Sequence, residues 1–156
     1  MFRSTKRFSG FSCCFRQWRA SHSHCQYLHG YAISFVVEFA GPLDHRNWVC
    51  DFGSFSYNGV KERLKYLFDH TTIIAADDPH IEMFQELEYK GLVQLRVVEA
   101  VGAEKFAELV YNEISALLQK DLHATGRVYV SRVECFENEN NSAIFIAPNP
   151  SLELPL

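Results

Sequence analysis

A stretch of alternating residues between Tyr31 and Phe39 constrains the fold of this chain more than any other feature. Every second position in it is large and apolar, and these positions are Tyr31, Ile33, Phe35, Val37 and Phe39. Successive side chains of a strand point to opposite faces, so this period predicts a strand with one buried face. The Gly41-Pro42 pair predicts its end.

Further strands are predicted on both sides of this one. The aromatic and cysteine-rich segment 8–18 favours a strand, and so does the short segment 92–98. Two more strands are predicted near 127–136 and 142–147. The turn between them, 137–141, is rich in asparagine, which predicts a hairpin.

Three helices are predicted in the middle of the chain. Apolar residues spaced along one helical face indicate a short helix ending near Phe68 and a longer one over 104–118. The Asp77-Asp78-Pro79 sequence is typical of a cap and first turn, and it precedes a helical pattern that stops at Gly91.

This order of elements predicts an α+β fold. Runs of strands on either side of a helical block favour a four-stranded antiparallel sheet with helices on one face. The other face of the sheet then requires a partner or a closed assembly.

Composition limits the number of domains and the class of partner. The chain has 156 residues, 47% of them apolar, which suits one buried core. We expect one domain over residues 1–148 and a flexible or interface-seeking tail over 149–156. The net charge of −4, without a run of Lys or Arg, argues against nucleic acid or an anionic membrane as a partner. With no apolar stretch of signal-peptide or membrane-spanning length and an odd count of five cysteines, we expect a cytoplasmic protein with reduced thiols.

Two groups of residues have the chemistry of a reactive site. Cys25 lies close to His29 at the mouth of the alternating strand, where an imidazole can lower a thiol pKa and create a nucleophile or base. Asp69 and His70 follow a predicted helix, and a carboxylate there can orient an imidazole for proton transfer.

The remaining polar residues of interest have both functional and structural interpretations. His22, His24, His29 and His70 could supply nitrogen ligands to zinc, but none of the usual zinc-site spacings occurs. For His22 and His24, surface residues in a polar loop are the simpler interpretation. Glu137 opens the predicted hairpin turn, where a carboxylate either accepts two N–H groups of a ligand or is simply solvated.

The order of these features resembles the 6-pyruvoyltetrahydropterin and 6-carboxytetrahydropterin synthase family. The segment 25–31 is similar to its Cys-x-x-Leu-His-Gly-His motif, and 47–52 to its Trp-hydrophobic-hydrophobic-Asp-Phe stretch. Residues 67–70 resemble its Leu-Asp-His signature, and 137–145 its Glu-Thr-x-Asn-Asn hairpin. The resemblance extends over roughly 8–145.

The resemblance implies a tunnelling fold (T-fold), in which monomers close into barrels, typically as a homohexamer of two trimers. It also implies an active site shared between subunits that binds a reduced pterin such as 7,8-dihydroneopterin triphosphate. Cys25 would be the general base, Asp69 and His70 its proton-relay partners, and Glu137 the anchor of the pterin ring. Gly102-Ala103-Glu104 stands where the family has Thr-Ser or Thr-Thr before Glu, so Glu104 and the backbone of Ala103 are expected to contact the pterin.

The zinc site of the family is altered in this sequence. The segment 11–15 aligns without gaps with Phe-x-Ala-Ala-His, which puts Phe15 at the first ligand position, and Tyr31 replaces the last histidine. A phenol with a pKa of about 10 is a poor zinc ligand at neutral pH, although it is a good hydrogen-bond donor. Only His29 remains, unless His22 or His24 joins it through a second alignment at 18–22.

We therefore expect a pterin lyase of the 6-carboxytetrahydropterin synthase type, as in the 7-deazaguanine (queuosine) route. The alternatives are a metal-free enzyme with an altered pterin reaction and a non-catalytic pterin-binding protein. A folate-pathway aldolase on the same fold is less consistent with the Cys-x-x-Leu-His-Gly segment.

Overall fold

The alternating segment that dominates the sequence forms two strands in two different sheets. The computed structural model describes residues 1–148, and in it β3 (His29–Tyr31) precedes β4 (Ser34–Gly41). Phe35, Val37 and Phe39 of β4 have no exposed surface, as the alternation predicts. The prediction of one continuous strand is wrong, because the chain leaves the smaller sheet after β3 and enters the main sheet at β4.

The main sheet has four antiparallel strands in the order β1-β4-β7-β8, which confirms the predicted sheet. Its other strands are β1 (Phe2–Phe8), β7 (Tyr129–Phe136) and β8 (Ser142–Ile146). The strand predicted within 8–18 is the short β2 (Cys13–Phe15) of another sheet, and β1 is not predicted by the sequence. Edge strand β1 is mostly polar and exposed, so it has no apolar alternation to reveal it.

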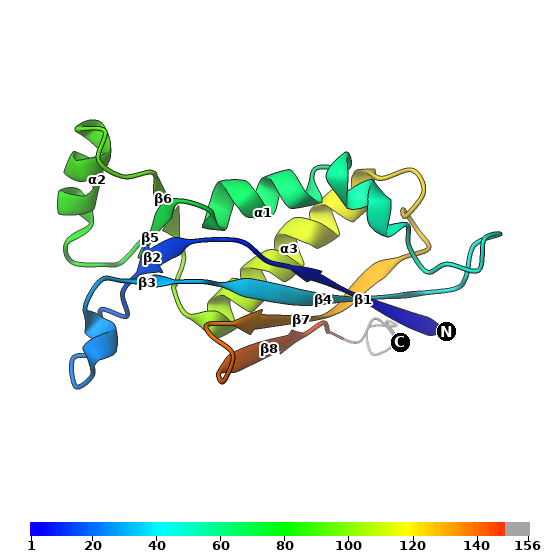
Figure 1. Cartoon of the computed structure of the whole chain (residues 1–156), viewed down its shortest axis with the longest axis horizontal. Coiled ribbons are helices and arrows are strands. Elements are labelled where there is room, and N and C mark those ends of the chain that lie inside the picture. The colour runs from blue at the N-terminus through cyan, green and yellow to red at the C-terminus, as the bar shows by residue number, and fades with distance from the viewer. Residues whose placement is uncertain (149–156) are drawn as a thin grey trace, which may run out of the picture.

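A second, smaller sheet was not predicted. Its order is β3-β2-β5-β6, where β2 is Cys13–Phe15, β5 is Thr71–Ala75 and β6 is Leu95–Val98. β5 runs parallel to both of its neighbours and is buried on both faces, so its sequence lacks the period of a half-buried strand. Figure 1 shows this sheet at the end of the molecule opposite the N-terminus.

The three predicted helices are present as α1 (Val60–Phe68), α2 (Ile81–Tyr89) and α3 (Ala103–Lys120). In Figure 1, α1 and α3 lie along the same face of the main sheet, and α2 lies beside the smaller sheet. The predicted cap of α2 is wrong. His80 precedes the helix without a capping side chain, and Asp77 and Asp78 bind residues of a distant loop instead.

Aromatic side chains join the main sheet to its helices. The ring of Phe35 lies 4.8 Å from that of Phe68 on α1, which in turn lies 5.4 Å from Phe106 on α3. The opposite face of the sheet carries the ion pairs Arg3–Glu38 and Arg132–Glu134, and beside them the exposed apolar side chains of Ile144 and Ile146. This mixed face is free for other contacts in a single chain.

Within residues 1–148, no helix is long and apolar enough to cross a membrane. The predicted tail, 149–156, lies outside the described residues.

Candidate active site

A cavity of about 750 Å³ opens where the main sheet meets the smaller one. Arg7 at the end of β1, His29 and Tyr31 of β3, and Glu137 and Asn138 of the β7–β8 hairpin are among the residues that line it. Three residues singled out in the sequence, from segments about a hundred positions apart, therefore share one cavity. Arg7 also lines the cavity, and the sequence did not single it out because strand β1 was not predicted.

Glu137 stands at the start of a turn that its neighbours hold rigid. The backbone N–H of Glu137 donates to the carbonyl of Asn141 over 3.1 Å, and the side chain of Asn138 accepts the N–H groups of Asn140 and Asn141. Among the described residues, no group donates a hydrogen bond to the carboxylate of Glu137. Its oxygens are available to a ligand in the cavity.

Tyr31 connects the cavity to the core. Its ring stacks on Phe15 with 4.0 Å between centroids and lies 4.5 Å from the ring of His29. Burial raises the pKa of Tyr31 to about 12, and the nearby charges of Glu137 and Cys25 contribute to the rise. The phenol therefore keeps its proton at neutral pH and can act as a donor.

Two of the three positions that correspond to the family's zinc ligands hold aromatic residues, Phe15 and Tyr31, that stack on each other. Phe15 is fully buried and packs edge-on against Phe106 with 4.9 Å between centroids, so the first ligand position belongs to the core. His29 is exposed, and its Nδ1 lies 2.8 Å from the carbonyl of Tyr27. His22 and His24 are exposed on the loop between β2 and β3. No three His, Cys, Asp or Glu residues between 1 and 148 lie close enough to hold a metal ion.

Cys25 lies on that loop, in a short 3₁₀ turn (His24–Gln26). Its side chain is exposed, and its N–H donates to the hydroxyl of Ser23 over 3.2 Å. Its carbonyl accepts the N–H of Gln17 over 2.7 Å, which closes the base of the loop. Cys25 does not itself line the cavity, although its charge contributes to the raised pKa of Tyr31.

Asp69 and His70 form a hydrogen-bonded pair immediately after α1. An oxygen of Asp69 lies 3.1 Å from Nδ1 of His70, and the same oxygen accepts the N–H of Ser12. The bond from Ser12 and then that from His70 lower the pKa of Asp69. The contact with the ionised carboxylate orients the exposed ring of His70.

This pair is separate from Cys25 within one chain. β2 and β5 run parallel, so Asp69 and His70, which precede β5, lie at the end of the sheet where β2 begins. The loop with Cys25 leaves from the other end, where β2 stops. His70 lines a second cavity of about 510 Å³ that shares only Gly30 with the first. The three predicted catalytic residues are not brought together in the monomer.

Glu104 and Ala103 lie at the start of α3, which Figure 1 shows at the same end of the molecule as the hairpin. Gly102 precedes them with a φ of 116°, and a Cβ at this position would lie 2.3 Å from Nε2 of Gln17. Burial raises the pKa of the Cys135 thiol, and the charges of Glu137 and Glu104 raise it further. Glu137 itself directly follows the end of β7.

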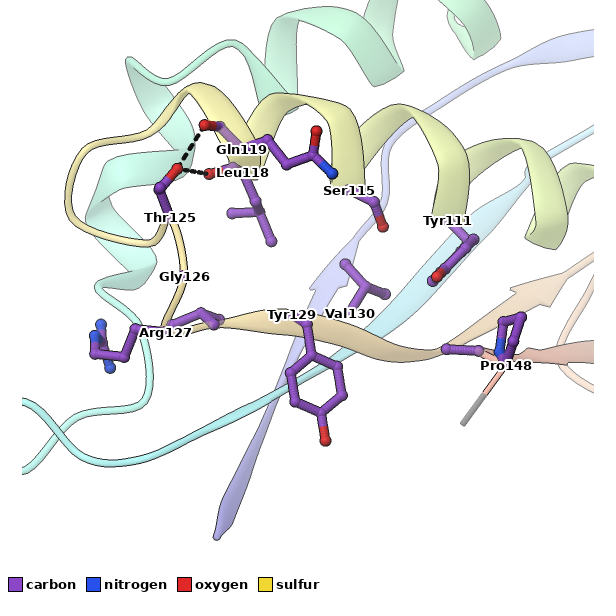
Figure 2. Close-up of a pocket in the computed structure, with 12 residues that line it drawn as sticks. Tyr111, Ser115, Leu118, Gln119, Thr125, Gly126, Arg127, Tyr129, Val130 and Pro148 are labelled. Carbon is purple, nitrogen blue, oxygen red and sulfur yellow. Dashed lines mark hydrogen bonds between the residues drawn. The ribbon is translucent and has the colours of Figure 1, made fainter. Parts of the chain in front are cut away.

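Another cavity, of about 410 Å³, lies at the opposite end of β7 (Figure 2). Figure 2 shows Tyr111 and Ser115 of α3 above Val130, and the Thr125 hydroxyl bonded to the carbonyls of Leu118 and Gln119. None of the residues predicted for catalysis or binding lines this cavity. We therefore base the functional argument on the first cavity.

Comparison with known proteins identifies the class of the fold. The chain is similar to an uncharacterized protein from Wolinella succinogenes, with a TM-score of 0.76 and 21% identity over 94% of this chain and 98% of that one. For 6-pyruvoyl tetrahydropterin synthase from Plasmodium vivax the TM-score is 0.65 and the identity 14%, over 93% and 98% of the two chains. For 6-pyruvoyl tetrahydropterin synthase from Caenorhabditis elegans the TM-score is 0.59 and the identity 16%, over 95% of this chain and 98% of that one. The α+β architecture is thus that of the T-fold proteins.

The family is identified by the sequence itself. Residues 4–148 match the 6-pyruvoyl tetrahydropterin synthase family, and the chain belongs to it. A search of curated proteins finds no match. Membership confirms the resemblance found in the motifs and supports a pterin-processing, lyase-like function.

Proposed function

We propose that the protein is a lyase acting on a reduced pterin, in which Cys25, Asp69 and His70 transfer protons and no zinc ion occupies the family's metal position. The observation that carries the proposal is the cavity lined by Glu137 and Tyr31. A reduced pterin offers the matching groups: ring N–H donors for a carboxylate and side-chain oxygens for a phenol.

Glu137 would bind the pterin ring. Its carboxylate is half-buried and faces the cavity from a turn fixed by Asn138. A carboxylate accepts two parallel N–H bonds well, and a rigid turn reduces the entropy lost on binding. Glu104 and the backbone of Ala103, at the start of α3, would contact the same ligand.

Proton transfer would require two copies of the chain. Cys25 and the Asp69–His70 pair lie at opposite ends of the strands of the smaller sheet, so a second subunit must supply one of them. This separation supports the expected homohexamer with shared active sites. Cys25 would take a proton from the substrate, and His70, oriented by Asp69, would pass it on.

Tyr31 would replace the metal as the group that polarises a substrate oxygen. Its pKa of about 12 keeps the phenol protonated, and its stacking on Phe15 fixes its direction. A fixed donor aimed at developing charge stabilises a transition state without a metal ion.

The substrate we propose is 7,8-dihydroneopterin triphosphate or a related reduced pterin, and the reaction is carbon–carbon or carbon–oxygen cleavage as in 6-carboxytetrahydropterin formation for 7-deazaguanines. We place the enzyme in the cytoplasm. Free thiols at all five cysteines are consistent with a reducing compartment.

The decisive experiment is turnover of 7,8-dihydroneopterin triphosphate by the purified wild type and by Cys25→Ala, with products identified by mass spectrometry. We expect product from the wild type and a loss of at least a hundredfold in kcat for the variant, since proton transfer contributes about 10²–10⁴-fold. Elemental analysis of the same sample should find less than one zinc per chain. Equal turnover by both proteins would exclude Cys25 as the base.

The second candidate is a pterin-binding protein without catalytic activity. The replacement of metal ligands by the buried Phe15 and the stacked Tyr31 favours it. It predicts ligand binding without product. In a fluorescence titration with a reduced pterin, Glu137→Gln should then weaken binding about tenfold or more, because it replaces a charged acceptor, while Cys25→Ala should bind like the wild type.

A further inference from the structure

Arg16 and Asp78 form an ion pair that anchors the loop carrying Cys25. Nε and Nη2 of Arg16 donate to the two carboxylate oxygens of Asp78 over 2.8 and 2.9 Å. The Asp78 side chain is only 1% exposed and that of Arg16 20%. Asp78 also accepts the N–H of His80 over 2.8 Å, so its position is fixed from its own segment. The pair therefore connects the start of the loop to the segment after β5.

Arg16 and its neighbour Gln17 contact the backbone of Cys25 and of the residue after it. Nη1 of Arg16 donates to the carbonyl of Gln26 over 3.4 Å, and the N–H of the next residue, Gln17, donates to the carbonyl of Cys25 over 2.7 Å. The Gln17 side chain then donates to the carbonyl of Val101, just before α3. The turn that carries the thiol is thus held against the two segments that precede α2 and α3.

Stability alone is a weak reason for such a pair. Removing two charges from water costs free energy that their attraction often only offsets, whereas a two-bond pair fixes geometry well. A second tether, from Trp18 and Arg19 to Asp77, is exposed and lies on the outer part of the same loop. It provides a matched comparison.

We propose that the Arg16–Asp78 pair is a positioning device for Cys25. It holds the loop between β2 and β3 so that the thiol stands beside the Tyr31 end of the cavity. The inference rests on the proposed role of Cys25 as a base, because a misplacement of about 1 Å can cost about a hundredfold in rate.

The test combines kinetics with the reactivity of the thiol. Arg16→Lys, Arg16→Gln, Asp78→Asn, the double variant Arg16→Gln/Asp78→Asn and the control Asp77→Asn are compared with the wild type for kcat and KM on 7,8-dihydroneopterin triphosphate. The rate at which iodoacetamide alkylates Cys25 is followed over pH by peptide mass spectrometry. Cys25 is the one exposed cysteine among the described residues, and the other four are buried or half-buried, which favours its selective labelling.

We expect Asp78→Asn and Arg16→Gln to lower kcat about a hundredfold with KM within about twofold, and to change the alkylation rate and its pH profile. Arg16→Lys, which keeps the charge and loses the two-bond geometry, should lie between them and the wild type. The double variant should match the single ones, because both remove the same interaction. Asp77→Asn should behave as the wild type.

The inference would be overturned if Asp78→Asn and Arg16→Lys had the alkylation rate and the kcat of the wild type. It would also be overturned if the fold-changes of the two single variants multiplied in the double variant. Circular dichroism establishes folding, and Arg16→Lys carries the test if Asp78→Asn does not fold. Failure of the proposed function is recognised separately, by turnover that survives Cys25→Ala. In that case the alkylation rates still decide whether the pair positions the thiol.

Discussion

At the scale of single residues, one aromatic stack changes the chemistry available to this member of the family. Phe15 occupies the first metal-ligand position and is fully buried, and Tyr31 occupies the last and stacks on it. The two rings pack against each other with 4.0 Å between their centroids. The phenol that remains is a proton donor.

The role of Tyr31 is tested by Tyr31→Phe, which removes the hydroxyl and keeps the ring. If the phenol polarises a substrate oxygen, kcat should fall about a hundredfold, as for the loss of one fixed donor at an oxyanion. The free energy of unfolding should change by less than about 1.5 kcal/mol, because one hydrogen-bonding group is lost and the packing is kept. Both are measured on one preparation, by steady-state kinetics and urea unfolding. An unchanged kcat would remove Tyr31 from the mechanism.

At the scale of elements, the connection between β5 and α2 does more than join them. Its aspartates, predicted as a helix cap, hold the loop between β2 and β3. Burial tends to raise the pKa of Asp78, but the bonds from Arg16 and His80 outweigh it, so that the pKa is lowered overall. The ionised form of Asp78 therefore stabilises the folded state.

A carboxyl group with a lowered pKa contributes stability above its unfolded pKa of about 3.9, and this contribution is lost as the pH falls through the folded value. At pH 7, Asp78→Asn should lower the free energy of unfolding by roughly 3 kcal/mol, because Arg16 loses its buried partner. Below a pH of about 3.9 the difference from the wild type should shrink. Urea unfolding at both ends of this range measures it.

Asp77→Asn is the control for this pH dependence, because its pair with Arg19 is exposed. It should change the free energy of unfolding by less than about 1 kcal/mol at either pH. A difference between Asp78→Asn and the wild type that stays constant down to low pH would show that charge on Asp78 does not stabilise the fold.

At the scale of the whole molecule, the single chain separates groups that the proposed reaction needs together. The main sheet has one face covered by α1 and α3 and one face without helices, with β1 and β8 at its edges (Figure 1). An assembly through these surfaces is what the expected barrel requires. The proposed reaction requires in addition that the assembly bring Asp69 and His70 of one copy to Cys25 of another.

Mixed oligomers test this sharing directly. Cys25→Ala and His70→Ala should each be inactive alone, whereas their co-expression should recover about a quarter of wild-type activity, since each site draws its two residues independently from the two variants. Turnover of the co-purified mixture is compared with that of the two variants mixed after purification. No recovery on co-expression would place the complete site within one chain.

The sequence by itself determined the elements whose side chains repeat with a clear period. β4, α1 and α3 were predictable because one face of each is buried and the other is not, and the hairpin because asparagines specify its turn. The family and the identity of Cys25, Asp69, His70 and Glu137 as site candidates also follow from local motifs, since a motif is a property of neighbouring residues.

Only the tertiary structure decided which of those residues meet. β5 is buried on both faces and β1 is mostly polar, so neither strand shows an alternation of apolar and polar residues. The sequence therefore did not reveal the smaller sheet, or Arg7 of β1 as a residue of the cavity. Arg16 and Asp78 are 62 positions apart in the sequence. They meet because β2 and β5 run parallel, so that the loops after the two strands lie at the same end of the sheet. Distances between distant segments follow from packing, and so the separation of Cys25 from Asp69 and His70 could be found only in the folded chain.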